Sequence, residues 1–183
     1  MQDKDSDAVQ KLVAKDQIRE LVHLYSQAIT SRDRDLMISL YIKDASFGSM
    51  GSGEETLRSL MNETMNDLEF AVILIANHSI SFEGPDLASG EVWARCYAQN
   101  RTEGYYEQLV KYVDKYQMTE LEDDGTQVWK FRSRRHLLWF GEGKESPLKL
   151  PEASWPQRNI GIGRLSLADE AVQSFRKKGP STN

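Results

Sequence analysis

Residues 77–97 read NHSISFEGPDLASGEVWARCY, and polar and apolar side chains alternate on both sides of a central Gly-Pro-Asp triplet. Alternation with a period of two is typical of strands that bury one face, and Gly-Pro-Asp favours a turn. The stretch therefore predicts two antiparallel strands joined by a hairpin. A run rich in β-branched residues at 70–75 precedes it, and residues 108–121 and 128–140 predict two further strands around a turn that ends in Asp-Gly.

The chain before residue 68 has a helical pattern instead. A first helix is predicted to begin near Asp16. Its apolar face carries Ile18, Leu21, Val22, Tyr25 and Ile29. Either Asp33 or Asp35 could cap a second short helix, and Glu54 begins a third. Helices followed by an antiparallel meander predict an α+β fold around one core.

The two ends of the chain have different patterns from the centre. Residues 1–15 are predicted to form an N-terminal arm, and 16–140 the α+β domain. Residues 141–175 contain three prolines and scattered apolar side chains. Because a long structureless run is unusual unless it packs on something, this segment is predicted to form a strap over a pocket or a subunit interface. Residues 176–183 are predicted to be a disordered tail.

Composition and charge exclude several classes of protein. The 183 residues carry a net charge of -5 with acids and bases interspersed, unlike the basic stripe of a nucleic-acid-binding protein. No run approaches the roughly 20 apolar residues of a membrane-spanning helix. The polar start MQDKDSDAVQ does not resemble a signal peptide, so a cytoplasmic location is expected. The single cysteine, Cys96, excludes an internal disulfide and is expected to be a small buried side chain.

Three stretches together resemble the SnoaL-like family of the nuclear-transport-factor-2-like superfamily. They are IRELVHLYSQAITSRDRDLMISLYIKDASF at 18–47, the hairpin at 77–97, and YVDKYQMTELEDDGTQVWKFRSRRHLLW at 112–139. Relatives in this family include scytalone dehydratase, limonene-epoxide hydrolase, polyketide cyclases and bile-acid dehydratase. The resemblance implies a cone-shaped sheet whose wide end is closed by the N-terminal helices over a central apolar pocket. It also implies ring-containing small-molecule ligands, no cofactor, and homodimers or higher homo-oligomers.

The resemblance also implies site residues, position by position. The family's helix-one tyrosine is Tyr25, and its last-strand arginine is Arg134. The aspartate five residues after the tyrosine is Thr30 here, and the strand histidine is Ile73. The usual Asp–His base pair is therefore missing.

Two other histidines could supply the base. His78 faces inward only if a bulge shifts the register of its strand, and otherwise faces outward. His136 shares its strand parity with Arg134, opposite to Trp129 and Phe131. One of these two sets is expected to face inward, and the family spacing assigns the arginine set to the pocket. The predicted catalytic residues are Tyr25, Arg134, His136 and His78.

The remaining candidates would bind substrate. They are Asn77, Trp93, Tyr97, Tyr112 and Arg132. Because a buried arginine needs an anionic or polar partner, Arg134 is expected to pair either with Asp114 or with a substrate oxygen. Tyr25 could equally be a core tyrosine. No spacing of His or Cys indicates a metal site.

Two functions are open. The first is a cofactor-independent lyase, isomerase or cyclase that moves a proton on an aromatic, steroid-like or polyketide-like substrate. The second is a non-catalytic binding or structural subunit of the same fold, as in aromatic-ring dioxygenase β subunits. The missing Asp–His pair favours the second function, and the concentration of His, Arg and Tyr near the predicted pocket favours the first.

Overall fold

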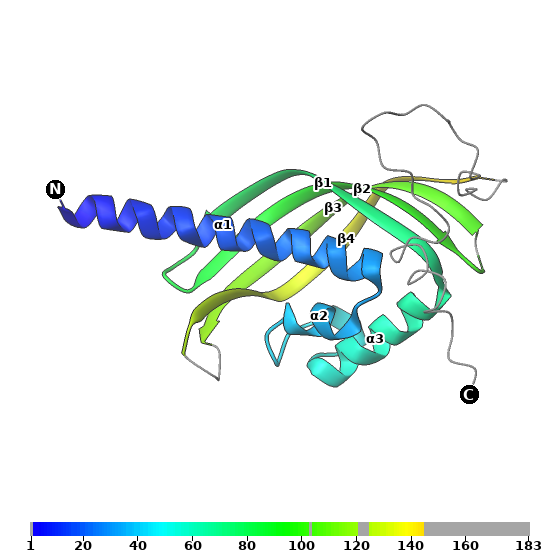
Figure 1. The fold of residues 1–183 in the computed structure, drawn as a ribbon, viewed down its shortest axis with the longest axis horizontal. Helices are drawn as coiled ribbons and strands as arrows, with labels where there is room; N and C mark the ends of the chain where they lie inside the picture. Colours follow the sequence, from blue (N-terminus) through cyan, green and yellow to red (C-terminus); the bar gives the residue numbers. More distant parts are fainter. Residues whose placement is uncertain (1, 103, 121–124, 145–183) are drawn as a thin grey trace, which may run out of the picture.

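The computed structural model describes residues 2–102, 104–120 and 125–144. The helices are α1 (Gln2–Ser31), α2 (Arg34–Ser39), the short 3-10 helix η1 (Gly48–Met50) and α3 (Glu54–Asp67). The strands are β1 (Leu68–Phe82), β2 (Leu87–Asn100), β3 (Gly104–Glu120) and β4 (Gln127–Lys144). They form one antiparallel sheet in the order β1-β2-β3-β4, and the helices lie against one face of this curved sheet (Figure 1). The α+β fold with a curved antiparallel sheet is confirmed.

Helix α1 begins much earlier than expected. It starts at Gln2 and not near Asp16, so the predicted loose arm is helical, and its N-terminal end projects beyond the sheet (Figure 1). The core-facing stripe that begins at Ile18 hid this extension, because before it Ala14 packs against the core while Val9, Leu12 and Val13 are exposed. Good helix formers and an i,i+4 pair between Lys11 and Asp7 at 3.0 Å favour the helix.

The segment between the helices is fixed by caps and by the sheet edge. Asp33 caps α2 by accepting a hydrogen bond from the Leu36 backbone N–H at 2.9 Å, which decides between the two predicted caps. The chain then runs along β4. The Phe131 backbone donates to the Leu40 carbonyl at 2.8 Å and accepts from the Ile42 N–H at 3.0 Å. This segment therefore covers part of the exposed edge of the sheet.

Two β-bulges decide which side chains reach the inner face. In β1 the register shifts between Ile75 and His78, so His78 pairs with Val92 and faces inward. The bulge that an inward-facing His78 requires is therefore present. In β4 the register shifts beside Arg132, because Phe131 pairs with Tyr116 while Ser133 pairs with Lys115.

The bulge in β4 places both sets of residues on the inner face. Trp129 and Phe131 lie on the inner face before the bulge, and Arg134 and His136 lie on the same face after it. The expectation that only one set faces inward is wrong, because the extra residue reverses the alternation. Arg132 is exposed and does not share the face of Arg134. Strand β4 also continues to Lys144, so 141–144 are strand and not strap, and the rest of the predicted strap and tail lies outside the described residues.

The inner face of the sheet and α1 enclose the core. Its fully buried members include Ile18, Val22, Met37, Met65, Val92, Val110, Tyr116 and Phe131. Cys96 is buried among them, as predicted. The Ser26 hydroxyl of α1 donates to the Ile73 carbonyl of β1 at 2.6 Å and ties the helix to the sheet. Within the described ranges, no helix is both long enough and apolar enough to cross a membrane.

Gly90 lets two inner-face elements approach each other. A Cβ at this position would lie 2.7 Å from the Ser79 carbonyl oxygen and 3.1 Å from the Tyr116 hydroxyl oxygen. We expect Gly90→Ala to lower the free energy of unfolding by about 1–3 kcal/mol, because the backbone must shift to admit the methyl group. Thermal denaturation measures the loss. Gly143→Ala, where nothing lies within 4 Å of the new Cβ, is the matched control and should melt like the wild type.

Candidate functional site

The centre of the inner face is a buried ion pair between neighbouring strands. Arg134 of β4 donates from Nε to Asp114 Oδ1 at 2.9 Å and from Nη2 to Asp114 Oδ2 at 2.7 Å. Their side chains are 2% and 0% exposed. Burial alone would lower the pKa of Arg134, but the adjacent carboxylate raises it above its ordinary value. The pair is therefore a fixed guanidinium–carboxylate unit.

Aromatic rings surround the guanidinium of Arg134. Its Cζ lies 4.3 Å from the ring centroids of Tyr25, Tyr112 and Phe131. Its Nη1 is buried and has no hydrogen-bond partner among the described residues. A buried donor without a partner is unusual in a folded protein, so Nη1 is the nitrogen of Arg134 that is left to donate to a further acceptor.

A hydrogen-bonded chain leads from the ion pair to His78. The Tyr116 hydroxyl donates to Asp114 Oδ2 at 2.8 Å, and His78 Nε2 lies 3.1 Å from the same hydroxyl oxygen. Because the single hydroxyl proton is given to Asp114, His78 must donate from Nε2. The lone pair of the neutral imidazole is therefore on Nδ1, which is the atom able to accept a proton.

His78 is uncharged at neutral pH. Burial, opposed by the Asp114 carboxylate and assisted by Arg134, lowers its pKa from 6.5 to about 4. An imidazole in this state can act as a general base without first losing a proton. The sequence placed a base at this residue only on condition of a bulge, and β1 supplies that bulge.

Tyr25 and Tyr112 form the aromatic wall of the site. Their ring centroids are 5.8 Å apart in an edge-to-face arrangement, and Tyr25 lies at a similar distance from Phe131, 6.0 Å. Burial raises the pKa of Tyr25, and the Arg134 charge partly offsets that rise. Both hydroxyls therefore stay protonated at neutral pH and can donate hydrogen bonds.

His136 lies at the edge of this cluster. Its ring centroid is 5.3 Å from that of Tyr112, and the residue is otherwise exposed on the edge strand. Partial desolvation, together with the charge of Arg134, lowers its pKa. His136 is thus on the predicted face, at the rim of the cluster.

Four predicted substrate-binding residues lie elsewhere. Trp93 and Tyr97 alternate with the buried residues of β2 and so face outward, where Trp93 contacts Trp139 with centroids 5.1 Å apart. Asn77 is exposed within the β1 bulge, and Arg132 is exposed at the β4 bulge. These four substrate-binding candidates therefore do not lie beside Arg134, because strand alternation and the two bulges turn their side chains away. Tyr112 is the substrate-binding candidate that the structure places beside Arg134.

Tyr116 is the site residue that the sequence reasoning missed. Tyr112, Asp114 and Tyr116 alternate in YVDKY, so their common parity with an inward Asp114 was the available signal. The positions of the family's usual base pair are occupied by residues that cannot transfer protons in this way. Ile73 is buried on the inner face opposite Cys96, and Thr30 is half-buried on α1.

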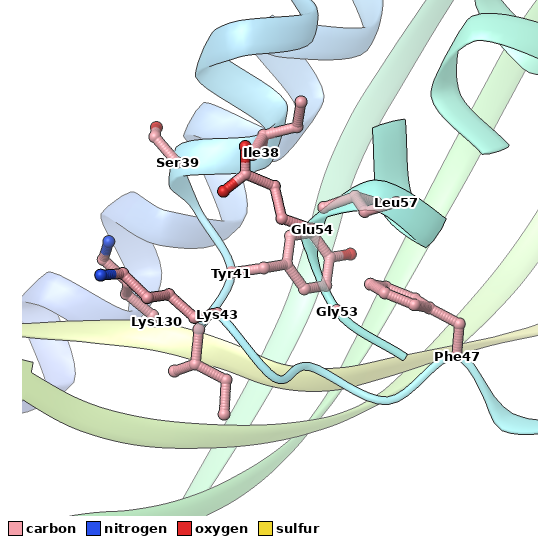
Figure 2. A pocket seen from close by; sticks show the side chains of 10 residues that line it. Ile38, Ser39, Tyr41, Lys43, Phe47, Gly53, Glu54, Leu57 and Lys130 are labelled. Atoms are coloured by element: carbon pink, nitrogen blue, oxygen red, sulfur yellow. The ribbon is translucent and has the colours of Figure 1, made fainter. Parts of the chain in front are cut away.

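A pocket of about 130 Å³ opens away from this cluster, between α2, α3 and β4 (Figure 2). Tyr41, Phe47 and Leu57 supply its apolar lining, and Lys43 and Lys130 flank it. It shares no residue with the Arg134 cluster, so it is not the predicted central pocket. In the described part of the chain, no group of three or more His, Cys, Asp or Glu side chains could hold a metal ion.

Comparisons with known proteins agree with the fold. Among solved structures, a type 2 hexachlorocyclohexane dehydrochlorinase (LinA) superposes with a TM-score of 0.67 at 17% identity, covering 79% of this chain and 98% of that chain. A candidate scytalone dehydratase from Novosphingobium aromaticivorans gives a TM-score of 0.63 at 15% identity, with 79% and 99% coverage. No curated protein matches the sequence. The profile of the SnoaL-like domain matches residues 10–135, so the chain belongs to the SnoaL-like domain family.

Proposed function

We propose that the protein is a cofactor-independent lyase that eliminates H–X from a small apolar molecule by proton transfer. The observation that carries the proposal is the inner-face chain His78–Tyr116–Asp114–Arg134. It supplies a neutral base at one end and a buried cationic donor at the other. Membership of the SnoaL-like family supports the proposal, as do the activities named for the dehydrochlorinase and the candidate dehydratase.

The elimination assigns a role to each group. His78 Nδ1 takes a proton from a substrate carbon, and the electrons of the broken C–H bond form a carbon–carbon double bond. The neighbouring C–X bond breaks, and X leaves with its electron pair. Nη1 of Arg134 donates to the departing group, where negative charge develops, and the Tyr25 hydroxyl is a second donor. The proton on His78 then leaves with X as HX, which restores the neutral imidazole.

The surroundings of Arg134 favour a ring-containing substrate. Three aromatic rings lie 4.3 Å from its guanidinium carbon, and aliphatic side chains occupy most of the rest of the inner face. Flat apolar molecules stack well against such walls, while the few polar groups fix their orientation.

Two named compounds test the proposal. The purified protein is incubated, without added cofactor and in the presence of EDTA, with hexachlorocyclohexane and with scytalone. Chloride release and formation of the dehydrated product are the readouts. We expect turnover of at least one compound by the wild type and none by His78→Gln. Equal activity of the two proteins, or no turnover of either compound, would contradict the lyase assignment for these substrate classes.

The non-catalytic alternative has one observation in its favour. Ile73 and Thr30 occupy the positions of the family's catalytic His and Asp. This fits a protein that retains the fold but not the catalytic residues. A structural subunit should copurify with a larger catalytic chain when expressed from its native locus. A protein that purifies alone and eliminates HX excludes this alternative.

We also propose that the chain forms a homo-oligomer. The outer sheet face exposes Val72 and Leu74 on one side of Arg95, and Leu109, Trp139 and Phe140 on the other. The N-terminal part of α1 exposes Val9, Leu12 and Val13. Large apolar side chains exposed in groups are typical of interfaces. Light scattering coupled to size exclusion should give at least twice the 20.9 kDa chain mass, and Trp139→Glu should shift the protein toward the monomer.

A further inference from the structure

We infer that the inner-face site selects uncharged ligands that offer a hydrogen-bond acceptor to Arg134 Nη1, and that it discriminates against carboxylates of the same shape. The inference rests on the proposed function for the location of the ligand. It adds a rule of charge selection that neither the fold nor the family relation contains. A buried arginine in a binding site usually suggests an anionic ligand. The contacts of Arg134 point the other way.

The first step is the charge on the inner face. Among the buried and half-buried side chains that the strand register places there, only Asp114 and Arg134 carry a full charge. They neutralise each other through the bidentate pair. The side chains that α1 buries against this face are uncharged. They are Ile18, Leu21, Val22, Tyr25, Ala28 and Ile29. The inner face around Arg134 is therefore electrically neutral before a ligand binds. The other buried cation, Arg32, follows α1 and donates to the Glu69 carbonyl at the start of β1.

The second step is the state of the other titratable groups. His78 is neutral because its pKa is about 4, and the pKa of His136 is lowered as well. Arg19 and His23 of α1 also lower the pKa of His78, but both side chains are exposed to solvent, which screens their effect. Among the side chains of the described inner face and those that α1 buries against it, no further positive charge is available to balance an anion beside Arg134.

The third step is the cost of each kind of ligand. A carboxylate beside Arg134 would compete with Asp114 for one guanidinium, and the buried site would carry an uncompensated negative charge. An uncharged acceptor adds no charge. It would satisfy Nη1, the buried nitrogen that lacks a partner among the described residues. A hydrogen bond from Nη1 to such an acceptor favours binding, because a buried donor that makes no hydrogen bond is costly.

The fourth step is the direction in which the donor is held. Asp114 occupies the Nε and Nη2 edge of the guanidinium, which fixes the plane of the group. The rings of Tyr25 and Tyr112 pack against it. Nη1 is left as the donor for a ligand, so a single acceptor atom on a flat apolar body is the complementary shape.

Two isosteric probes test the inference by binding alone. 2-Acetylnaphthalene and 2-naphthoate share a ring system and differ in charge. Their dissociation constants are measured at pH 7.5 by titration calorimetry with the full chain. We expect the ketone to bind the wild type at least about tenfold more tightly than the carboxylate, because of the charge balance inside the site. Equal or tighter binding of 2-naphthoate, or no binding of the ketone, overturns the inference.

A charge variant locates the effect. Asp114→Asn leaves Arg134 as an uncompensated cation, and we expect the preference for the ketone to fall at least about tenfold or to invert. Glu91→Gln makes the same change in net charge at an exposed residue that pairs with Lys111 across β2 and β3, and it should leave the preference unchanged. An unchanged preference in Asp114→Asn, or an equal change in Glu91→Gln, overturns the assignment to Arg134.

The outcomes separate this inference from the proposed function. Charge selection can hold in a protein that turns nothing over, which would refute the lyase and leave the binding rule intact. If Asp114→Asn does not fold, the double variant Asp114→Asn with Arg134→Gln keeps the interior uncharged and replaces the ion pair with an amide pair. It should keep the preference for the ketone, and a preference for 2-naphthoate in this variant would contradict the inference.

Discussion

Replacing Arg134 with methionine is expected to lower the free energy of unfolding by about 3–5 kcal/mol, because it leaves the Asp114 carboxylate buried and unpaired. Asp114 is 0% exposed and accepts both guanidinium hydrogen bonds. In a domain of this size, the loss corresponds to a fall in melting temperature of about 6–20 °C. Thermal denaturation followed by circular dichroism measures it.

Two variants separate charge pairing from general damage. Arg134→Met combined with Asp114→Leu removes both charges, and it should recover most of the lost stability because an apolar pair can replace a buried ion pair. Arg135→Met, at the exposed neighbouring position, should melt within about 0.5 kcal/mol of the wild type. A single Arg134→Met variant as stable as the wild type would show that the ion pair is not a structural element.

The alternating strands made the sheet predictable, and the bulges made the site hard to predict. In residues 77–97 and 108–140, apolar and polar side chains alternate over runs long enough to indicate strands. The fold class and the strand order therefore follow from the local pattern. A bulge is a single extra residue, and its position depends on distant partners. In β4 the bulge coincides with three backbone hydrogen bonds. The Phe131 N–H donates to the Leu40 carbonyl, the Ile42 N–H donates to the Phe131 carbonyl, and the Ser46 N–H donates to the Arg132 carbonyl. No pattern within the strand itself encodes those contacts.

Parity accounts for the residues that were placed wrongly. Trp93 and Tyr97 are aromatic and stand on a buried strand, which suggests a pocket lining, yet they alternate with Val92, Ala94 and Cys96 and so face outward. Arg132 and Arg134 are two residues apart and would share a face in a regular strand, but the bulge beside Arg132 separates them. The residue types indicated the chemistry of the site. Which of these residues reach the inner face depended on the pairing register of the strands.

The chain His78–Tyr116–Asp114–Arg134 shows the limit of transfer from a family. The family's last-strand arginine is present as Arg134, and its catalytic Asp and His are replaced by Thr30 and Ile73. Transfer from the family could not show that the β1 bulge brings a histidine to the inner face at a new position, because that outcome depends on two residues opposing Trp93. The parity of YVDKY places Tyr116 on the face of Asp114, and the structure adds that its hydroxyl links Asp114 to His78.

Replacing His78 with glutamine is expected to reduce kcat by about 10²–10⁴-fold on whichever of the two test compounds the wild type converts. Glutamine keeps an amide N–H that can donate to the Tyr116 hydroxyl, but it has no nitrogen able to accept a proton. The melting temperature should therefore change little. His23→Gln, at an exposed histidine of α1, is the matched control and should retain the wild-type kcat.

The pH dependence of the wild type gives an independent check on the same residue. A neutral His78 is the active form, and its pKa is about 4. Protonation removes the base, so kcat/KM should fall as the pH drops through about 4 and should remain flat between pH 6 and 8, where an ordinary histidine would titrate. The acid limb should be absent from the residual activity of His78→Gln. An acid limb that persists in His78→Gln and is lost in His136→Gln would instead assign the base to His136 at the rim of the cluster.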